Sequence, residues 1–159
     1  MMIYLTEWTI KPEYGNSNTA YKIGITKYGP KRLFEERFPE DPNKRGYDER
    51  HAWFDKKLLA HVMYSHDSYQ LAAAATFGIE AVMQAICPKK FQLEEHFELN
   101  EEYNFDKFGG ITEWFKIDDS NLTIEEVIEV FENLNNRLWV MDNNIKSIYG
   151  KNKSTMEDF

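Results

Sequence analysis

Two cationic side chains, Lys22 and Arg32, lie ten residues apart, and their spacing suits the binding of one phosphate group. Lys22 belongs to the run 21–26, whose β-branched and aromatic residues predict a strand. A Gly-Pro pair at 29–30 predicts a turn, and Arg32 falls in the first turn of the helix expected next. This arrangement can converge an ammonium and a guanidinium group on a phosphate. The alternative is a buried strand, turn and helix whose charges are merely solvated.

A carboxylate, Glu80, lies in the middle of an apolar run. The alanine-rich segment 69–86 follows Ser68, which suits a helix N-cap, and Pro88 stops it, so we expect one long helix. A carboxylate among apolar neighbours needs a partner, a metal ion or solvent. Two interpretations therefore stay open: Glu80 belongs to a site, or it lies on the exposed stripe of its helix.

Strand-like segments surround the candidate residues. Residues 1–10 alternate as a strand does, and the turn-rich segment 11–19 predicts an antiparallel hairpin that places Tyr4 and Lys22 on one side of a sheet. Further segments predict a third strand at 58–65, short helices at 49–56 and 90–102, and a closing strand or apolar plug at 112–117. The expected fold class is α/β in an α+β arrangement: a small, mainly antiparallel three-stranded sheet flanked by helices.

The last expected element is a long amphipathic helix. Thr123 and Glu126 form a capping box, and apolar residues then recur in steps of three and four up to Ile148. We expect one helix from about 123 to 149, packed along its own domain or forming a homodimer through residues 124–148. The predicted organisation is a domain at 1–117, this helix within 118–150 and a disordered tail at 151–159.

Composition limits the class of protein. The chain of 159 residues suits one domain with an appendage, and its single cysteine excludes an internal disulfide, so we expect a cytoplasmic protein. The most apolar run is too short to span a bilayer, and no membrane association is expected. The net charge of −8 argues against broad, non-specific nucleic-acid binding. However, residues 22–57 hold 10 basic against 7 acidic side chains.

Several of these residues occur in the order of a known family. The set comprises Tyr4, the triplet Lys22-Ile23-Gly24, Arg32, Glu80 and Glu113-Trp114-Phe115. It resembles the GIY-YIG nuclease superfamily, most closely its phage-associated branch with YKIGIT in place of YIG. Ile3-Tyr4 stands for the first triplet, without its glycine, and Lys22 stands for the second tyrosine. Glu36 falls four residues after the arginine, where the family often has His or Tyr. The resemblance covers residues 1–117.

The resemblance implies a Mg²⁺-dependent endonuclease that hydrolyses phosphodiester bonds of DNA, or of RNA. Tyr4 would act as the general base or relay the proton, with its pKa lowered by the charge of Lys22. Arg32 would grip the scissile phosphate, and Glu80 would hold Mg²⁺. The residues expected to contact the substrate are Gly24, Lys27, Lys31 and His51. The alternative is a non-catalytic binding or interaction module on the same scaffold, with the C-terminal helix as its partner surface.

Overall fold

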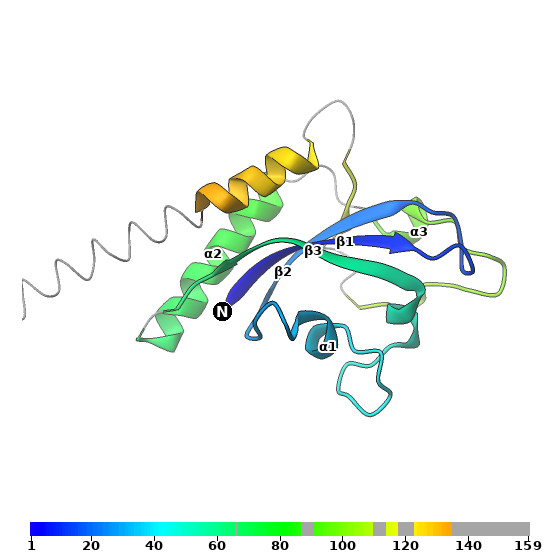
Figure 1. Ribbon diagram of the computed structural model, residues 1–159, viewed down its shortest axis with the longest axis horizontal. Helices are drawn as coiled ribbons and strands as arrows, with labels where there is room; N and C mark the ends of the chain where they lie inside the picture. Colours follow the sequence, from blue (N-terminus) through cyan, green and yellow to red (C-terminus); the bar gives the residue numbers. More distant parts are fainter. Residues whose placement is uncertain (66, 87–90, 110–113, 118–122, 135–159) are drawn as a thin grey trace, which may run out of the picture.

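The computed structural model describes residues 1–65, 67–86, 91–109, 114–117 and 123–134. A single antiparallel sheet with the strand order β3-β1-β2-β4 organises the fold (Figure 1). Its strands are β1 (Met2–Ile10), β2 (Thr19–Thr26), β3 (Phe54–Met63) and β4 (Trp114–Phe115). The helical elements are α1 (Leu33–Arg37), the 3₁₀ helix η1 (Glu49–Trp53), α2 (Tyr69–Ile86) and α3 (Leu93–His96). The fold is therefore α+β, as expected, but the described sheet has four strands instead of three.

The additional strand is the closing segment. β4 pairs with β2, with Trp114 opposite Lys22 and Phe115 opposite Tyr21. A strand of two residues is too short to show the alternation of apolar and polar residues that identifies strands in a sequence. The sequence of 112–117 is compatible with a strand or with an apolar plug, and the pairing with β2 decides for the strand.

The hairpin of β1 and β2 gives the sheet two distinct faces. Tyr4 pairs with Gly24 and Thr6 pairs with Lys22, so the expected neighbour relation of the two strands is confirmed. Successive side chains of a strand point to opposite faces. The two faces consequently carry two separate cores.

One face carries a core that we call the aromatic core. It contains Tyr4, Trp8, Phe38, Phe54 and Trp114 among its buried side chains. The ring of Trp8 packs edge-on against those of Phe38, Phe54 and Trp114, at centroid distances of 4.8, 5.3 and 4.9 Å. Because α1 follows β2 directly and supplies Leu33 to this core, the sequence after β2 folds over the face that carries Tyr4.

The opposite face carries the aliphatic core. Ile3, Leu5 and Ile23 of the sheet pack there with Met83 of α2. Val127 and Phe131, from the helical residues 124–134, complete the cluster. In Figure 1 this last helix and α2 lie on the side of the sheet away from α1 over much of their length. Two helices therefore cover the aliphatic core.

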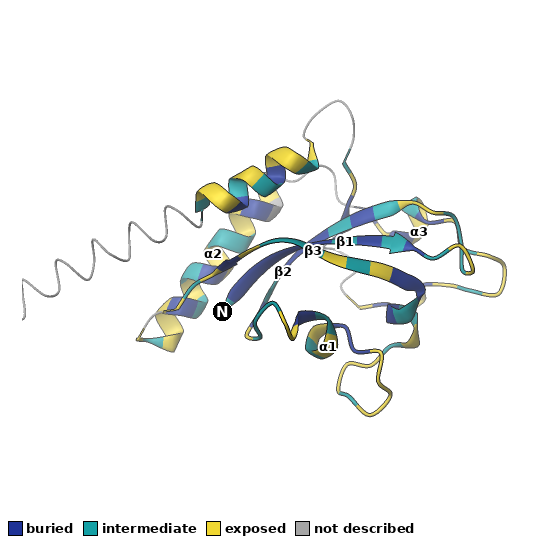
Figure 2. Ribbon diagram, viewed as in Figure 1, coloured by how far each residue is buried: buried dark blue, intermediate teal, exposed yellow. Residues whose placement is uncertain are grey.

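α2 matches its expected bounds, and Ser68 Oγ accepts a hydrogen bond from the backbone N–H of Leu71 at 3.4 Å. Its inner face buries Ala72 and Met83, whereas Leu71, Phe77 and Val82 are 57, 57 and 60% exposed. Figure 2 shows exposed residues along the outer side of this helix. Within the described part of the chain, no helix is both long and apolar enough to cross a membrane.

The start of the C-terminal helix is also confirmed. Thr123 Oγ1 accepts a hydrogen bond from the N–H of Glu126 at 3.2 Å and donates one to its carboxylate at 3.2 Å. The described first part of the apolar seam packs against the protein's own sheet, because Val127 and Phe131 are buried. The expected continuation to 149, the tail 151–159 and the second part of the seam lie outside the described residues. A homodimer through 124–148 stays a prediction.

Three boundaries differ from expectation. The short helix expected at 49–56 is the 3₁₀ helix η1 and ends at Trp53, directly before β3 begins. β3 begins at Phe54, four residues before the expected 58–65 strand, because Phe54 pairs with Ile10 of β1. β3 is an edge strand of the sheet, where exposed charges such as Asp55 and Lys57 are tolerated and hide the strand pattern. The helix expected at 90–102 is confined to α3 in the described residues.

Candidate functional site

Tyr4 lies directly across the backbone of Gly24. The Tyr4 ring is fully buried, and a Cβ atom added to Gly24 would overlap Tyr4 Oη and lie 2.6 Å from Cζ. Any side chain at position 24 would collide with the ring, so glycine is required there for a steric reason. The ring of Phe38 packs edge-on to Tyr4, at a centroid distance of 6.2 Å. Tyr4 and Gly24 thus form one packed unit at the centre of the hairpin.

Lys22 lies on the same face and is only 3% exposed. Its Nζ lies 5.3 Å from the ring centroid of Phe38 and 5.2 Å from that of Trp114, distances at which a cation is attracted by an aromatic ring. The backbone of Lys22 is fixed as well, because Thr6 Oγ1 donates to its carbonyl at 3.2 Å. The sheet therefore holds the Lys22 ammonium inside the aromatic core, two strand positions from Tyr4.

Arg32 lies at the surface instead. It precedes α1, and its side chain is 61% exposed. Arg32 Nη2 donates to Glu36 Oε1 at 2.7 Å, and the guanidinium lies 5.1 Å from the ring centroid of Tyr28. Since Lys22 is buried and Arg32 is exposed, the two cations do not share one solvent-accessible surface in this conformation. Their expected convergence on a phosphate would need the aromatic rings over Lys22 to move.

Glu80 lies on a different element, α2, whose neighbouring residues pack on the other face of the sheet. It is half-buried in α2, between Ile79 and Met83, whose side chains pack in the aliphatic core. The segment of α2 around Glu80 is thus anchored on the face opposite to Tyr4 and Lys22. Among the described residues, no group of three or more His, Cys, Asp or Glu side chains could hold a metal ion. The structure brings Tyr4, Gly24 and Lys22 together, but it anchors the Glu80 segment elsewhere.

The other expected substrate contacts divide into surface and core. Lys27 and Lys31 are exposed, and Lys27 Nζ lies 5.4 Å from the ring centroid of Tyr28. His51 is buried, and its Nδ1 lies 3.0 Å from the carbonyl oxygen of Pro39. Burial lowers the pKa of His51, although the bond to Pro39 opposes that change. His51 is thus a buried residue in this conformation, and its expected contact with the substrate stays a prediction.

Sequence reasoning missed a second lysine whose side chain is largely covered. Lys56 of β3 is 8% exposed in its side chain, and its Nζ lies 5.5 Å from the ring centroid of Trp8. It donates to the carbonyl oxygen of His51 at 2.6 Å and to Glu40 Oε1 at 3.2 Å. Burial lowers the pKa of Lys56, against the raising effect of Glu40. Two ammonium groups therefore lie against rings of the aromatic core, and the basic excess at 22–57 is the sequence signal that could have indicated Lys56.

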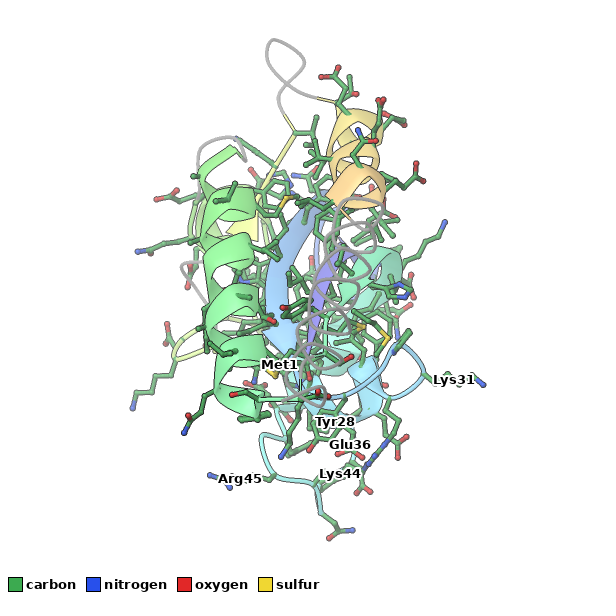
Figure 3. All side chains as sticks on the ribbon, turned by 90° about the vertical axis from the view of Figure 1, so that its left-hand side faces the viewer. Met1, Tyr28, Lys31, Glu36, Lys44 and Arg45 are labelled. Carbon is green, nitrogen blue, oxygen red and sulfur yellow. The ribbon has the colours of Figure 1, made fainter. Side chains whose placement is uncertain are left out.

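Sequence reasoning also missed a pocket beside α1. Its volume is about 390 Å³, and it is lined by Tyr28, Glu36, Arg37, Lys44, Arg45 and Gly46. Figure 3 shows Tyr28, Glu36 and Lys44 close together, with Lys31 and Arg45 extending into solvent on either side. Hydrogen bonds from Arg32 and Lys44 lower the pKa of Glu36, so this carboxylate is held in its charged form. The pocket combines an aromatic ring with several cations.

The chain was compared with known proteins in three ways. No family model matches its sequence. No curated protein and no solved structure matches it either.

Proposed function

We propose that this chain is an endonuclease of the GIY-YIG type that hydrolyses phosphodiester bonds of DNA. The observation that carries the proposal is the pairing of Tyr4 with Gly24 and the place of Lys22 on the same sheet face. A hydroxyl and an ammonium group from neighbouring strands are thereby held at fixed positions. Arg32, the third residue of the proposed site, follows the turn after β2 and is the N-cap residue of α1.

The chemistry of hydrolysis assigns a task to each residue. The reaction needs an activated water, neutralisation of developing negative charge and assistance to the leaving oxygen. Tyr4 would accept or relay the proton of the water, and Lys22 would supply positive charge beside it. Arg32 would bind the phosphate through its planar guanidinium. Because Phe38 and Trp114 flank the Lys22 ammonium, the proposal requires these rings to move when the substrate binds.

Mg²⁺ is the ion that the family resemblance implies, with Glu80 as its ligand. Mg²⁺ keeps several waters and needs only one or two carboxylates, so a single glutamate is enough in principle. However, the segment around Glu80 packs in the aliphatic core, away from Tyr4. These positions do not fit an ion shared between the two residues, and we assign no catalytic step to it. Dependence on Mg²⁺ remains part of the proposal to be tested.

A second candidate function is a DNA-binding module that does not cleave. Two observations favour it: the guanidinium of Arg32 is paired with Glu36, and Lys22 is 3% exposed. Such a module could still bind DNA, because the basic side chains of Lys27, Lys31 and Arg45 are exposed. Each is available for a phosphate contact that does not depend on the DNA sequence.

A plasmid-nicking assay separates the two candidates. The protein is incubated with supercoiled DNA in Mg²⁺ or in EDTA, beside the variants Tyr4→Phe and Lys22→Met. An endonuclease nicks the plasmid in Mg²⁺, and both variants lose activity by about 100-fold or more while keeping their fold. Absence of nicking by the unmodified protein, together with DNA binding measured by fluorescence anisotropy, would reject the endonuclease in favour of the binding module.

A further inference from the structure

Two cations from separate segments meet on one oxygen of Glu36. Arg32 Nη2 lies 2.7 Å from Glu36 Oε1, and Lys44 Nζ lies 3.1 Å from the same atom. Lys44 comes from the loop after α1 and also donates to Glu35 Oε1 at 2.8 Å. A guanidinium and an ammonium on one anionic oxygen are the donors that bind a phosphate oxygen. Glu36 Oε1 therefore takes up two donors of the kind that an external anion would use.

The surroundings of Glu36 suit a larger anion. The pocket of about 390 Å³ beside it is also lined by two further cationic side chains, Arg37 and Arg45, and by the aromatic ring of Tyr28. Its rim is open at Gly46, where an added Cβ would meet nothing within 4 Å. A cavity of this size exceeds the needs of Glu36 and falls within the range of small-ligand sites.

We propose that this pocket, together with Arg32 beside Glu36, is a phosphate-binding site, and that Glu36 occupies the Arg32 and Lys44 donors as an internal anion until a phosphate displaces it. The proposal rests on the proposed function only in naming a nucleic-acid backbone as the source of the phosphate. The exchange is feasible because partly exposed ion pairs are weak: the side chains of Arg32, Lys44 and Glu36 are 61, 28 and 19% exposed. Glu36 thereby limits how tightly this surface binds an anion.

Glu36→Gln tests the proposal because it keeps the shape of the side chain and removes its charge. Binding of a fluorescein-labelled DNA duplex is measured by fluorescence anisotropy at several salt concentrations. We expect affinity to rise several-fold, and the slope of log K against log salt to steepen by about 0.9 for each additional phosphate that the variant neutralises. Glu35→Gln is the matched control: Glu35 is also paired with Lys44, at 2.8 Å, but it does not line the pocket, and its effect should be smaller.

A second measurement tests phosphate binding directly on the unmodified protein. It depends neither on nuclease activity nor on whether Glu36→Gln folds. Inorganic phosphate is titrated into ¹⁵N-labelled protein, and the amide signals of Lys44 and Gly46 should shift, with the shifts lost in Lys44→Gln. Phosphate binding without DNA binding would support this site and overturn the proposed function instead. Unchanged or weaker DNA binding by a folded Glu36→Gln, with no phosphate-dependent shifts at Gly46, would overturn the site.

Discussion

Gly24→Ala tests the packing at the centre of the candidate site. The new methyl group would overlap the hydroxyl of Tyr4 and lie 2.6 Å from Cζ, and the ring is fully buried against Phe38. Forcing an extra methyl into a packed core costs about 1–3 kcal/mol of unfolding free energy. Replacing glycine lowers the entropy of the unfolded chain and returns about 0.4–1 kcal/mol. We therefore expect a net loss of roughly 1–2 kcal/mol, or about 2–8 °C in Tm for a chain of this size.

The assay is a thermal melt followed by circular dichroism, with Gly78→Ala as the matched control. Gly78 lies within α2, and an added Cβ there would meet nothing within 4 Å, so alanine should raise stability by about 0.5–1 kcal/mol. Tyr4→Phe combined with Gly24→Ala should recover part of the loss, because the overlapping hydroxyl is gone. A Gly24→Ala protein that melts at or above the unmodified protein would show that Tyr4 does not lie over Gly24.

Three further predictions concern the metal ligand, pH and assembly. If Glu80 holds Mg²⁺, Glu80→Ala should lower Mg²⁺-dependent nicking by about 1,000-fold while the variant stays folded, since alanine is the best helix former. Full activity of the variant would remove Glu80 from the site. Burial lowers the pKa of His51 in the folded protein, so the unfolded chain binds more protons, and stability should fall as pH drops below about 6.5. The change in Tm between pH 7.5 and 5.5 should be smaller in His51→Asn, and an equal change would assign the effect to other groups. If the seam forms a dimer, Leu138→Glu with Ile145→Glu should halve the mass measured by light scattering, whereas an unchanged mass would reject that interface.

The local elements could be predicted because their signals lie within short stretches of sequence. The hairpin follows from alternating residues around a turn-rich segment, and α2 follows from an alanine-rich run between Ser68 and Pro88. The capping box of Thr123 and Glu126 likewise depends on residues three apart. The neighbouring positions of Tyr4 and Lys22 followed from the hairpin alone. Each of these features needs no knowledge of distant parts of the chain.

The state of each candidate side chain was decided only by tertiary structure. Lys22 is buried because Phe38 and Trp114, distant in sequence, pack over it, and no local pattern marks that. The side of the sheet that Glu80 approaches depends on how α2 packs, since the helix is apolar on its exposed face as well as on its buried one. Lys44 reaches Glu36 through the fold of a polar loop. Sequence spacing therefore identified candidate residues and the common face of Tyr4 and Lys22, whereas the burial of Lys22, the face on which the segment around Glu80 packs and the contact of Lys44 with Glu36 are decided by contacts between separate segments of the chain.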